Sequence, residues 1–126
     1  MYSGISLKQW NNIWKDKNLT DRETNVTDVK SFAFDYSYDF ENGNYDDVIV
    51  EISNIPLEAF VAYRVGNISD NYDEYEEEET YADDDDFHTM NDMNDAEKKN
   101  TIDNYSLFLV SLYKYKDTIS TNLLKR

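Results

Sequence analysis

The clearest local pattern in this chain is an alternation of aromatic and polar residues between positions 32 and 40. Every second residue is aromatic and those between are small or acidic, which is the period of two expected of a strand with one buried face. A second alternating run, VIVEIS at 48–53, follows the turn-like sequence ENGN. Together the two runs predict a β-hairpin over residues 31–53. Its buried face is expected to carry Phe32, Phe34, Tyr36, Tyr38 and Phe40.

Two other stretches have helical periodicity. Residues 5–18 place two isoleucines and two tryptophans on adjoining helical positions, which predicts a short amphipathic N-terminal helix. Nearer the C-terminus, apolar residues over 102–123 recur at spacings of three, four and seven, after a capping residue at Asn94 or Asp95. This pattern predicts a long C-terminal helix of about 45 Å, with a break near Asp117 left open.

Residues 55–65 suit either a helix or a strand. Pro56 near the start and Gly66 just beyond the end favour a helix, which we prefer, whereas FVAYRV also suits a third strand. The chain is therefore expected to form one α+β domain over residues 1–126. In this arrangement a small antiparallel sheet, built from the 31–53 hairpin, has the N-terminal helix and the long C-terminal helix packed on its aromatic face.

The charge of the chain is large and unevenly distributed. Its 126 residues include 27 acidic residues against 12 lysines and arginines, for a formal net charge of −15. Residues 31–97 contain 21 of the acids and a single base, Arg64. The densest part, residues 70–95, holds 13 acids and no lysine or arginine. Since an ordinary protein surface interleaves charges of both signs, this imbalance indicates a surface used for binding.

Composition also excludes several classes of protein. A direct nucleic-acid binder needs a basic surface to displace counterions from phosphate, and an anionic membrane attracts bases, so neither role fits a charge of −15. The chain has no cysteine, which excludes disulfides and thiolate metal sites. It has no apolar run of about 20 residues and no N-terminal signal pattern, so a soluble cytoplasmic protein is expected.

Catalysis and metal binding have no support in the sequence. There is no glycine-rich phosphate loop, nucleophile elbow or Ser/His/Asp arrangement. The acidic run 83–86 lacks the ligand spacing and central glycine of a calcium loop, and His88 is the sole histidine. We therefore expect no enzyme activity, no cofactor and no dedicated metal site.

The acidic residues are instead candidates for contact with a basic protein. Over residues 70–95 the acids occur about every 3 Å if the segment is helical, close to the roughly 3.4 Å between phosphates along one DNA strand. A disordered, solvating loop is the alternative for this segment, although its tyrosines argue for partial order. The expected partner-binding residues are Asp35, Asp39, Asp46, Asp47, Asp70, Asp73, Glu74, Glu76, Glu77, Glu78, Glu79, Asp83, Asp84, Asp85 and Asp86.

Small size, absence of cysteine and acid–aromatic runs such as YDEYEEEETY make residues 31–97 resemble the acidic DNA-mimic proteins of phages and mobile elements. These include anti-restriction proteins, uracil-DNA glycosylase inhibitors and anti-CRISPR proteins. The resemblance is one of composition and carries no family motif. It implies an inhibitor that blocks the DNA-binding cleft of a bacterial defence nuclease, of the CRISPR effector or restriction type, in the bacterial cytoplasm. The alternative is an acidic immunity, antitoxin-like or chaperone-like protein that binds a basic partner without mimicking DNA.

Overall fold

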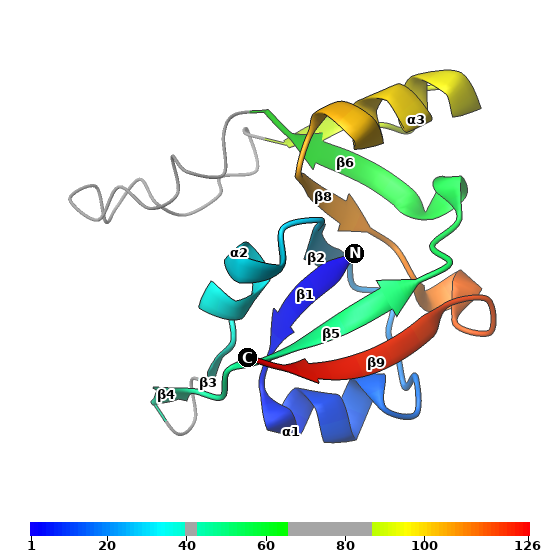
Figure 1. Cartoon of the computed structure of the whole chain (residues 1–126). Coiled ribbons are helices and arrows are strands. Elements are labelled where there is room, and N and C mark those ends of the chain that lie inside the picture. The colour runs from blue at the N-terminus through cyan, green and yellow to red at the C-terminus, as the bar shows by residue number, and fades with distance from the viewer. Residues whose placement is uncertain (40–42, 66–86) are drawn as a thin grey trace.

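Antiparallel strands dominate the computed structural model, which describes residues 1–39, 43–65 and 87–126 (Figure 1). Seven strands form one sheet in the order β7-β6-β8-β2-β1-β5-β9. A separate small hairpin pairs β3 (Tyr38–Asp39) with β4 (Asn44–Tyr45). The sheet strands are β1 (Tyr2–Ile5), β2 (Thr24–Thr27), β5 (Val48–Ser53), β6 (Phe60–Arg64), β7 (Phe87–Thr89), β8 (Leu107–Val110) and β9 (Ser120–Lys125).

Short helices connect these strands, and two of them, α1 and α3, begin at side-chain caps. The first, α1 (Leu7–Gln9), continues as a wider turn over Trp10–Trp14, and in its capping box the Gln9 amide donates to Ser6 Oγ at 3.1 Å. The longest, α3 (Asp95–Asn104), has the same arrangement between Asn94 and Glu97. The remaining helical segments are α2 (Lys30–Asp35) and two 3₁₀ turns, η2 (Leu57–Ala59) and η5 (Tyr113–Tyr115).

The predicted 31–53 hairpin is wrong. Residues 30–35 form α2, in which Phe32 and Phe34 are 4% and 6% exposed, whereas Tyr36 just after the helix is 53% exposed. Residues 32 and 34 point to different sides of a helix, and both side chains are buried here. Phe34 belongs to a cluster with Ile49 of the sheet, and the ring centroids of Phe32 and Tyr36 are 4.9 Å apart. The strand at 48–53 exists, but it pairs with β1 and β9 instead.

Glycine at position 4 permits α2 to lie on the sheet. A Cβ built on Gly4 would meet the carbonyl oxygen of Ala33 and lie 2.6 Å from the carbonyl carbon of Tyr36. Both obstacles are backbone atoms, so any larger residue in β1 would push the end of α2 away. The position of α2 therefore depends on a contact between residues about thirty positions apart in the sequence.

The predicted long C-terminal helix is also wrong, and the protein is mainly β. The helix ends at Asn104, and the rest of the chain forms β8 and β9. Residues 107–110, LFLV, are a continuous apolar run that supplies a central strand flanked by β6 and β2, and such runs match helical spacing by coincidence. Residues 55–65, for which a helix was preferred, contain one 3₁₀ turn and then strand β6.

The main core joins the two halves of the sheet. It combines Val50 and Ile52 of β5 with Phe60 of β6 and Phe108 of β8, all at most 3% exposed. The rings of Phe60 and Phe108 meet edge to face, with centroids 5.5 Å apart. Figure 1 shows β6, β8 and α3 in one half and β1, β5 and β9 in the other, with β2 between them.

Candidate functional site

The excess negative charge comes almost entirely from residues other than those that the structure describes, which we call the body. The described residues contain all 12 bases and 15 of the 27 acids, which leaves this body with a net charge of only −3. Residues 66–86, between β6 and β7, contain 11 acids and no base. The sequence-predicted positions from Asp70 to Asp86 all fall there and lie outside the described residues.

Both ends of this acidic connection are attached to the edge of the sheet. β6 and β7 form an antiparallel pair, and the Met90 amide donates to the Val61 carbonyl at 2.8 Å just beyond it. The Tyr63 ring stacks on His88 at 5.6 Å and packs on Tyr105 at 4.7 Å. The paired residues are Ala62 with Thr89, Tyr63 with His88 and Arg64 with Phe87. The connection therefore starts and ends at one ordered place.

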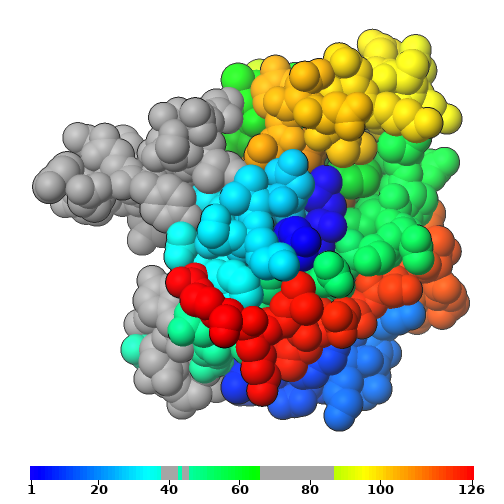
Figure 2. All heavy atoms as spheres, viewed as in Figure 1, coloured from blue at the N-terminus to red at the C-terminus, as the bar shows by residue number. Residues whose placement is uncertain are grey.

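Asp35 and Asp47 lie together at the end of β9, where both contact Arg126. The Arg126 Nη2 is 3.3 Å from Asp35 Oδ1, and its Nε is 3.6 Å from Asp47 Oδ1. The same guanidinium lies 5.0 Å above the Phe34 ring. Figure 2 shows the end of β9, in red, against α2, in cyan. Because Arg126 is 91 residues from Asp35, counting charges along the chain misses this compensation.

Asp46 has a structural role at the start of α1. Its Oδ2 accepts a hydrogen bond of 2.9 Å from the Leu7 amide, one of the helix's first N–H groups. Asp39 lies in β3, and its side chain is outside the described part. Asp35, Asp46 and Asp47 thus have partners within the fold, and the predicted 31–53 hairpin that would have brought these acids together does not form.

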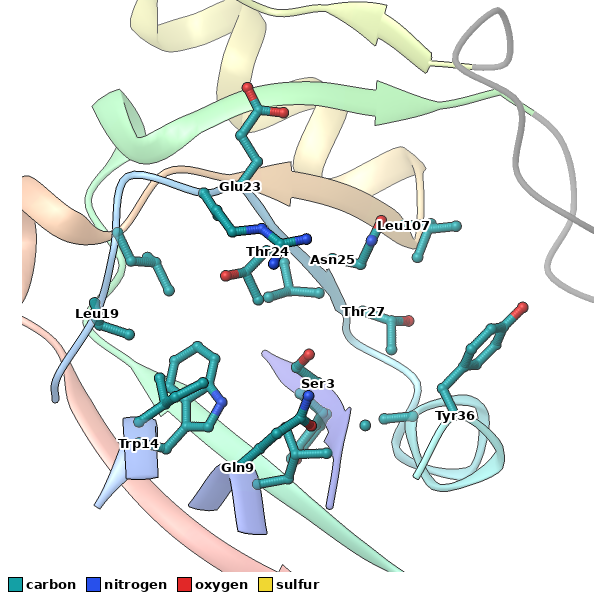
Figure 3. A pocket seen from close by; sticks show the side chains of 18 of the residues that line it. Ser3, Gln9, Trp14, Leu19, Glu23, Thr24, Asn25, Thr27, Tyr36 and Leu107 are labelled. Atoms are coloured by element: carbon teal, nitrogen blue, oxygen red, sulfur yellow. The ribbon is translucent and has the colours of Figure 1, made fainter. Parts of the chain in front are cut away.

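The structure also contains a groove that the sequence did not predict. It has a volume of about 740 Å³ and lies between β1 with α1 on one side and β2 on the other (Figure 3). Tyr36 lies at one end, and Trp14 and Leu19 lie at the other (Figure 3). Arg64 is also among the lining residues. No local pattern signals this groove, since β1 and β2 are separated by about twenty residues and their relative position depends on tertiary packing.

Burial raises the pKa of the Tyr36 phenol above its ordinary value. The positive charge of Arg64 opposes this rise, and the negative charge of Asp35 adds to it. Arg64 and Asp35 are therefore both near enough to Tyr36 to influence its pKa.

Two further features were sought within residues 1–39, 43–65 and 87–126. No group of three or more histidine, cysteine, aspartate or glutamate side chains in these ranges is placed to hold a metal ion. None of the helices in the same ranges is both long enough and apolar enough to cross a bilayer.

Comparisons of this chain with protein-family models, with curated proteins and with solved structures find no match.

Proposed function

We propose that this protein is an inhibitor that binds the basic DNA-binding cleft of a bacterial defence nuclease, of the CRISPR effector or restriction type, in the cytoplasm of the bacterial host. The observation that carries the proposal is the separation of charge. A body with a net charge of −3 holds both ends of a 66–86 connection that contains 11 acids and no base. Self-repulsion of this size is costly to keep, which favours a role in binding.

The mechanism is competition without chemistry. Carboxylates of residues 70–86 take the positions that phosphates would occupy against the lysines and arginines of the cleft. Their summed field steers association, which makes the rate fastest at low ionic strength. Because β6 and β7 are paired, the residues at which the connection begins and ends lie side by side at the edge of the sheet.

A second candidate is an acidic protein that covers a basic partner, as an immunity protein or antitoxin does, without imitating duplex geometry. The engagement of Asp35, Asp46 and Asp47 within the body favours it, because these carboxylates already have partners there. Duplex DNA distinguishes the two candidates: it displaces a mimic from its partner, whereas a protein bound away from the DNA-binding cleft stays bound.

The test begins with capture of the partner from a bacterial lysate and measurement of its affinity across a salt series. Replacing Glu76, Glu77, Glu78 and Glu79 with glutamine removes four charges and keeps side-chain size. We expect affinity to fall about tenfold at low salt, with a shallower salt dependence and an unchanged fold. Replacing Asp83, Asp84, Asp85 and Asp86 with asparagine should have a similar effect.

The matched control removes four exposed acids from the body. Changing Asp16, Asp21, Asp103 and Asp117 to asparagine removes the same number of negative charges as each connection variant. It should leave affinity within about threefold of the parent chain. If both connection variants bind as tightly as the parent chain, with the same salt dependence, the run is only a solubilising segment and the proposal fails.

A further inference from the structure

The outermost strand on one side of the sheet, β9, has an unpaired edge. It stands last in the strand order, and β5 is its only strand neighbour in the described part of the chain. Six consecutive residues of β9 pair with β5 without a shift in register, from Ser120 opposite Ser53 to Lys125 opposite Val48. In Figure 2, β9, in red, forms an uncovered band on the surface that faces the viewer.

Strand alternation shows which backbone groups of β9 point outwards. The Arg126 amide donates to the Asp47 carbonyl, so the even-numbered residues of β9 turn their N–H and C=O groups towards β5. The odd-numbered residues, Thr121, Leu123 and Lys125, turn theirs away from it. None of these outward backbone groups has a hydrogen-bond partner among the residues that the structure describes. Such a row of unpaired donors and acceptors is a template for a further strand.

β9 has few of the features by which proteins protect an edge strand from pairing. Its sequence, STNLLK, contains no proline, and its pairing with β5 contains no bulge. Its single charged residue, Lys125, lies at the end of the strand. The opposite edge strand, β7, has only three residues. Of the two edges of the sheet, β9 is therefore the one suited to pair with another chain.

Both faces of β9 carry leucines that the fold leaves half-buried. Leu123 packs against the main core, on the side where the Thr121 hydroxyl donates to the Trp14 carbonyl at 2.9 Å. Leu124 packs on the other side, with the cluster that contains Phe34 and Ile49. A further strand beside β9 would cover both leucines and extend both clusters.

The sequence of β9 suits an antiparallel copy of itself. With a two-fold axis at Leu123, the Leu123 side chains of two copies lie opposite each other. Lys125 then lies opposite Thr121 of the second copy, and Arg126 lies opposite its Ser120. No two like charges face each other in this register, so the strand pairs with itself without direct repulsion.

The strand order of the sheet also favours a second copy at β9. The acidic connection begins at β6 and ends at β7, at the opposite edge of the sheet. Pairing through β7 would bring together the points where the two connections, with 11 acids each, are attached. Pairing through β9 keeps these points at the two outer edges, where repulsion between the copies is smallest.

We propose that β9 is a dimerisation strand, which pairs antiparallel with β9 of a second copy of this chain about a two-fold axis at Leu123. The two seven-stranded sheets then form one continuous sheet. The interface uses no residue of the acidic connection. It is thus independent of the proposed inhibition, and either can fail without the other.

The first experiment measures the mass of the full chain by sedimentation equilibrium. We expect a reversible dimer with a dissociation constant of about 100 μM. Raising the salt from about 0.05 M to about 0.5 M should tighten it at least about threefold, because salt screens the repulsion between two chains of net charge −15. Binding of the acidic connection to a basic partner should weaken over the same range, so salt separates the two proposals.

The register can be tested by cross-linking, because the chain has no cysteine of its own. Leu123→Cys places two thiols at the axis, where the Cα atoms are about 5.5 Å apart and a disulfide can form. Ser120→Cys is the matched control, since it is more exposed but its Cα atoms would lie about 20 Å apart. Under mild oxidation, Leu123→Cys should form the linked dimer at least about tenfold faster. Equal rates for the two variants would overturn the proposed pairing.

Charge variants locate the interface. Leu123→Lys places two like charges opposite each other and should weaken the dimer at least about tenfold. Asn122→Lys adds the same charge one residue away, opposite Leu124 of the second copy, and should change the affinity by no more than about threefold. Circular dichroism checks the fold. If Leu123→Lys fails to fold, Lys125→Pro decides, because it removes an N–H group that points away from β5.

The proposal is overturned if the chain stays monomeric up to about 1 mM at high salt. It is also overturned if Leu123→Lys and Lys125→Pro dimerise as tightly as the parent chain, because the contact then lies elsewhere. A monomeric chain whose binding to the captured basic partner is weakened by Leu123→Lys would overturn it too, and would assign β9 to that partner.

Discussion

Two groups of acidic residues in this protein can be compared: those near the end of β9, and those in the connection between β6 and β7. Near the end of β9, Asp35 and Asp47 contact Arg126, and Asp46 accepts a hydrogen bond from the first turn of α1. Between β6 and β7, residues 66–86 contain 11 acids, and neither they nor the ten residues after them include a base. Acids in the first region have partners within the body. Those in the second are the acids that we propose to bind a basic partner.

The comparison shows that counting charges along the sequence overestimates the negative charge of a surface, because a base distant in sequence can lie beside the acids in the fold. Residues 31–53 read as an acidic face without a base because the base that compensates them, Arg126, is far away in sequence. Antiparallel pairing of β5 with β9 brings it there, and the Arg126 amide donates to the Asp47 carbonyl at 3.0 Å. Substitutions in the two regions should therefore separate stability from binding.

Gly4→Ala should have the largest effect on stability, because it disturbs the contact between β1 and α2, the helix that carries Asp35. The added methyl group meets backbone atoms of Ala33 and Tyr36, which cannot rotate away. We expect a loss of about 3 kcal/mol in the free energy of unfolding, measured with denaturant. Ser3→Ala, one position earlier in β1, is the control and should cost about 0.5 kcal/mol or less. Equal stability of the two variants would show that α2 does not depend on this contact.

Asp46→Ala should cost about 1 kcal/mol, because the Leu7 amide loses its acceptor at the start of α1. Thermal or denaturant unfolding measures this loss. Asp117→Ala, which removes an exposed acid elsewhere, should have little effect.

The glutamine variant of Glu76 to Glu79 should be as stable as the parent chain or slightly more so, since repulsion falls. A destabilised glutamine variant would erase the distinction between the two regions.

Arg126→Gln should cost roughly 0.5 kcal/mol, since its carboxylate partners are about half exposed and solvent weakens both pairs. The loss should shrink as salt is raised to about 1 M, because screening removes the ionic part first. Lys125→Gln serves as the neighbouring control. A loss that is independent of salt would mean that Arg126 acts by packing on Phe34 and not by its charge.

Tyr36 should show the smallest effect, in its titration. Burial raises its pKa above the usual value of about 10, with Arg64 opposing the rise and Asp35 adding to it. The folded chain therefore keeps this proton where the unfolded chain releases it, and the free energy of unfolding falls as pH rises above about 10. Arg64→Gln should raise the pKa further, and tyrosine carbon chemical shifts with Tyr36→Phe for assignment measure it. An unchanged pKa would separate Arg64 from this end of the groove.

Local patterns predicted some elements of the fold and not others. The helix expected over 5–18 is present only over residues 7–14, since Ile5 belongs to β1. The strand at 48–53 is present as expected. Caps, turn residues and alternation predict such elements because they act over a few positions. Phe32 and Phe34 occupy a helix despite a strand-like pattern, since Phe34 packs with Ile49 of the sheet and Gly4 lets the end of α2 lie against β1. Residues 107–123 continue a helical spacing yet form β8 and β9, because a central apolar strand and a buried helix share the same short-range signal.

The sequence by itself determined the charge of this protein, its lack of cysteine and the position of its acidic run, because these depend on composition and order alone. Only the tertiary structure decided that Asp35 and Asp47 meet Arg126, and that β1 and β2 separate to form a groove lined by Arg22 and Arg64. The physical reason is that both features join residues distant in the chain. Strand pairing brings these distant residues together, and so does the burial of Val50, Ile52, Phe60 and Phe108 in a shared core. Neither can be predicted from any single segment of the sequence.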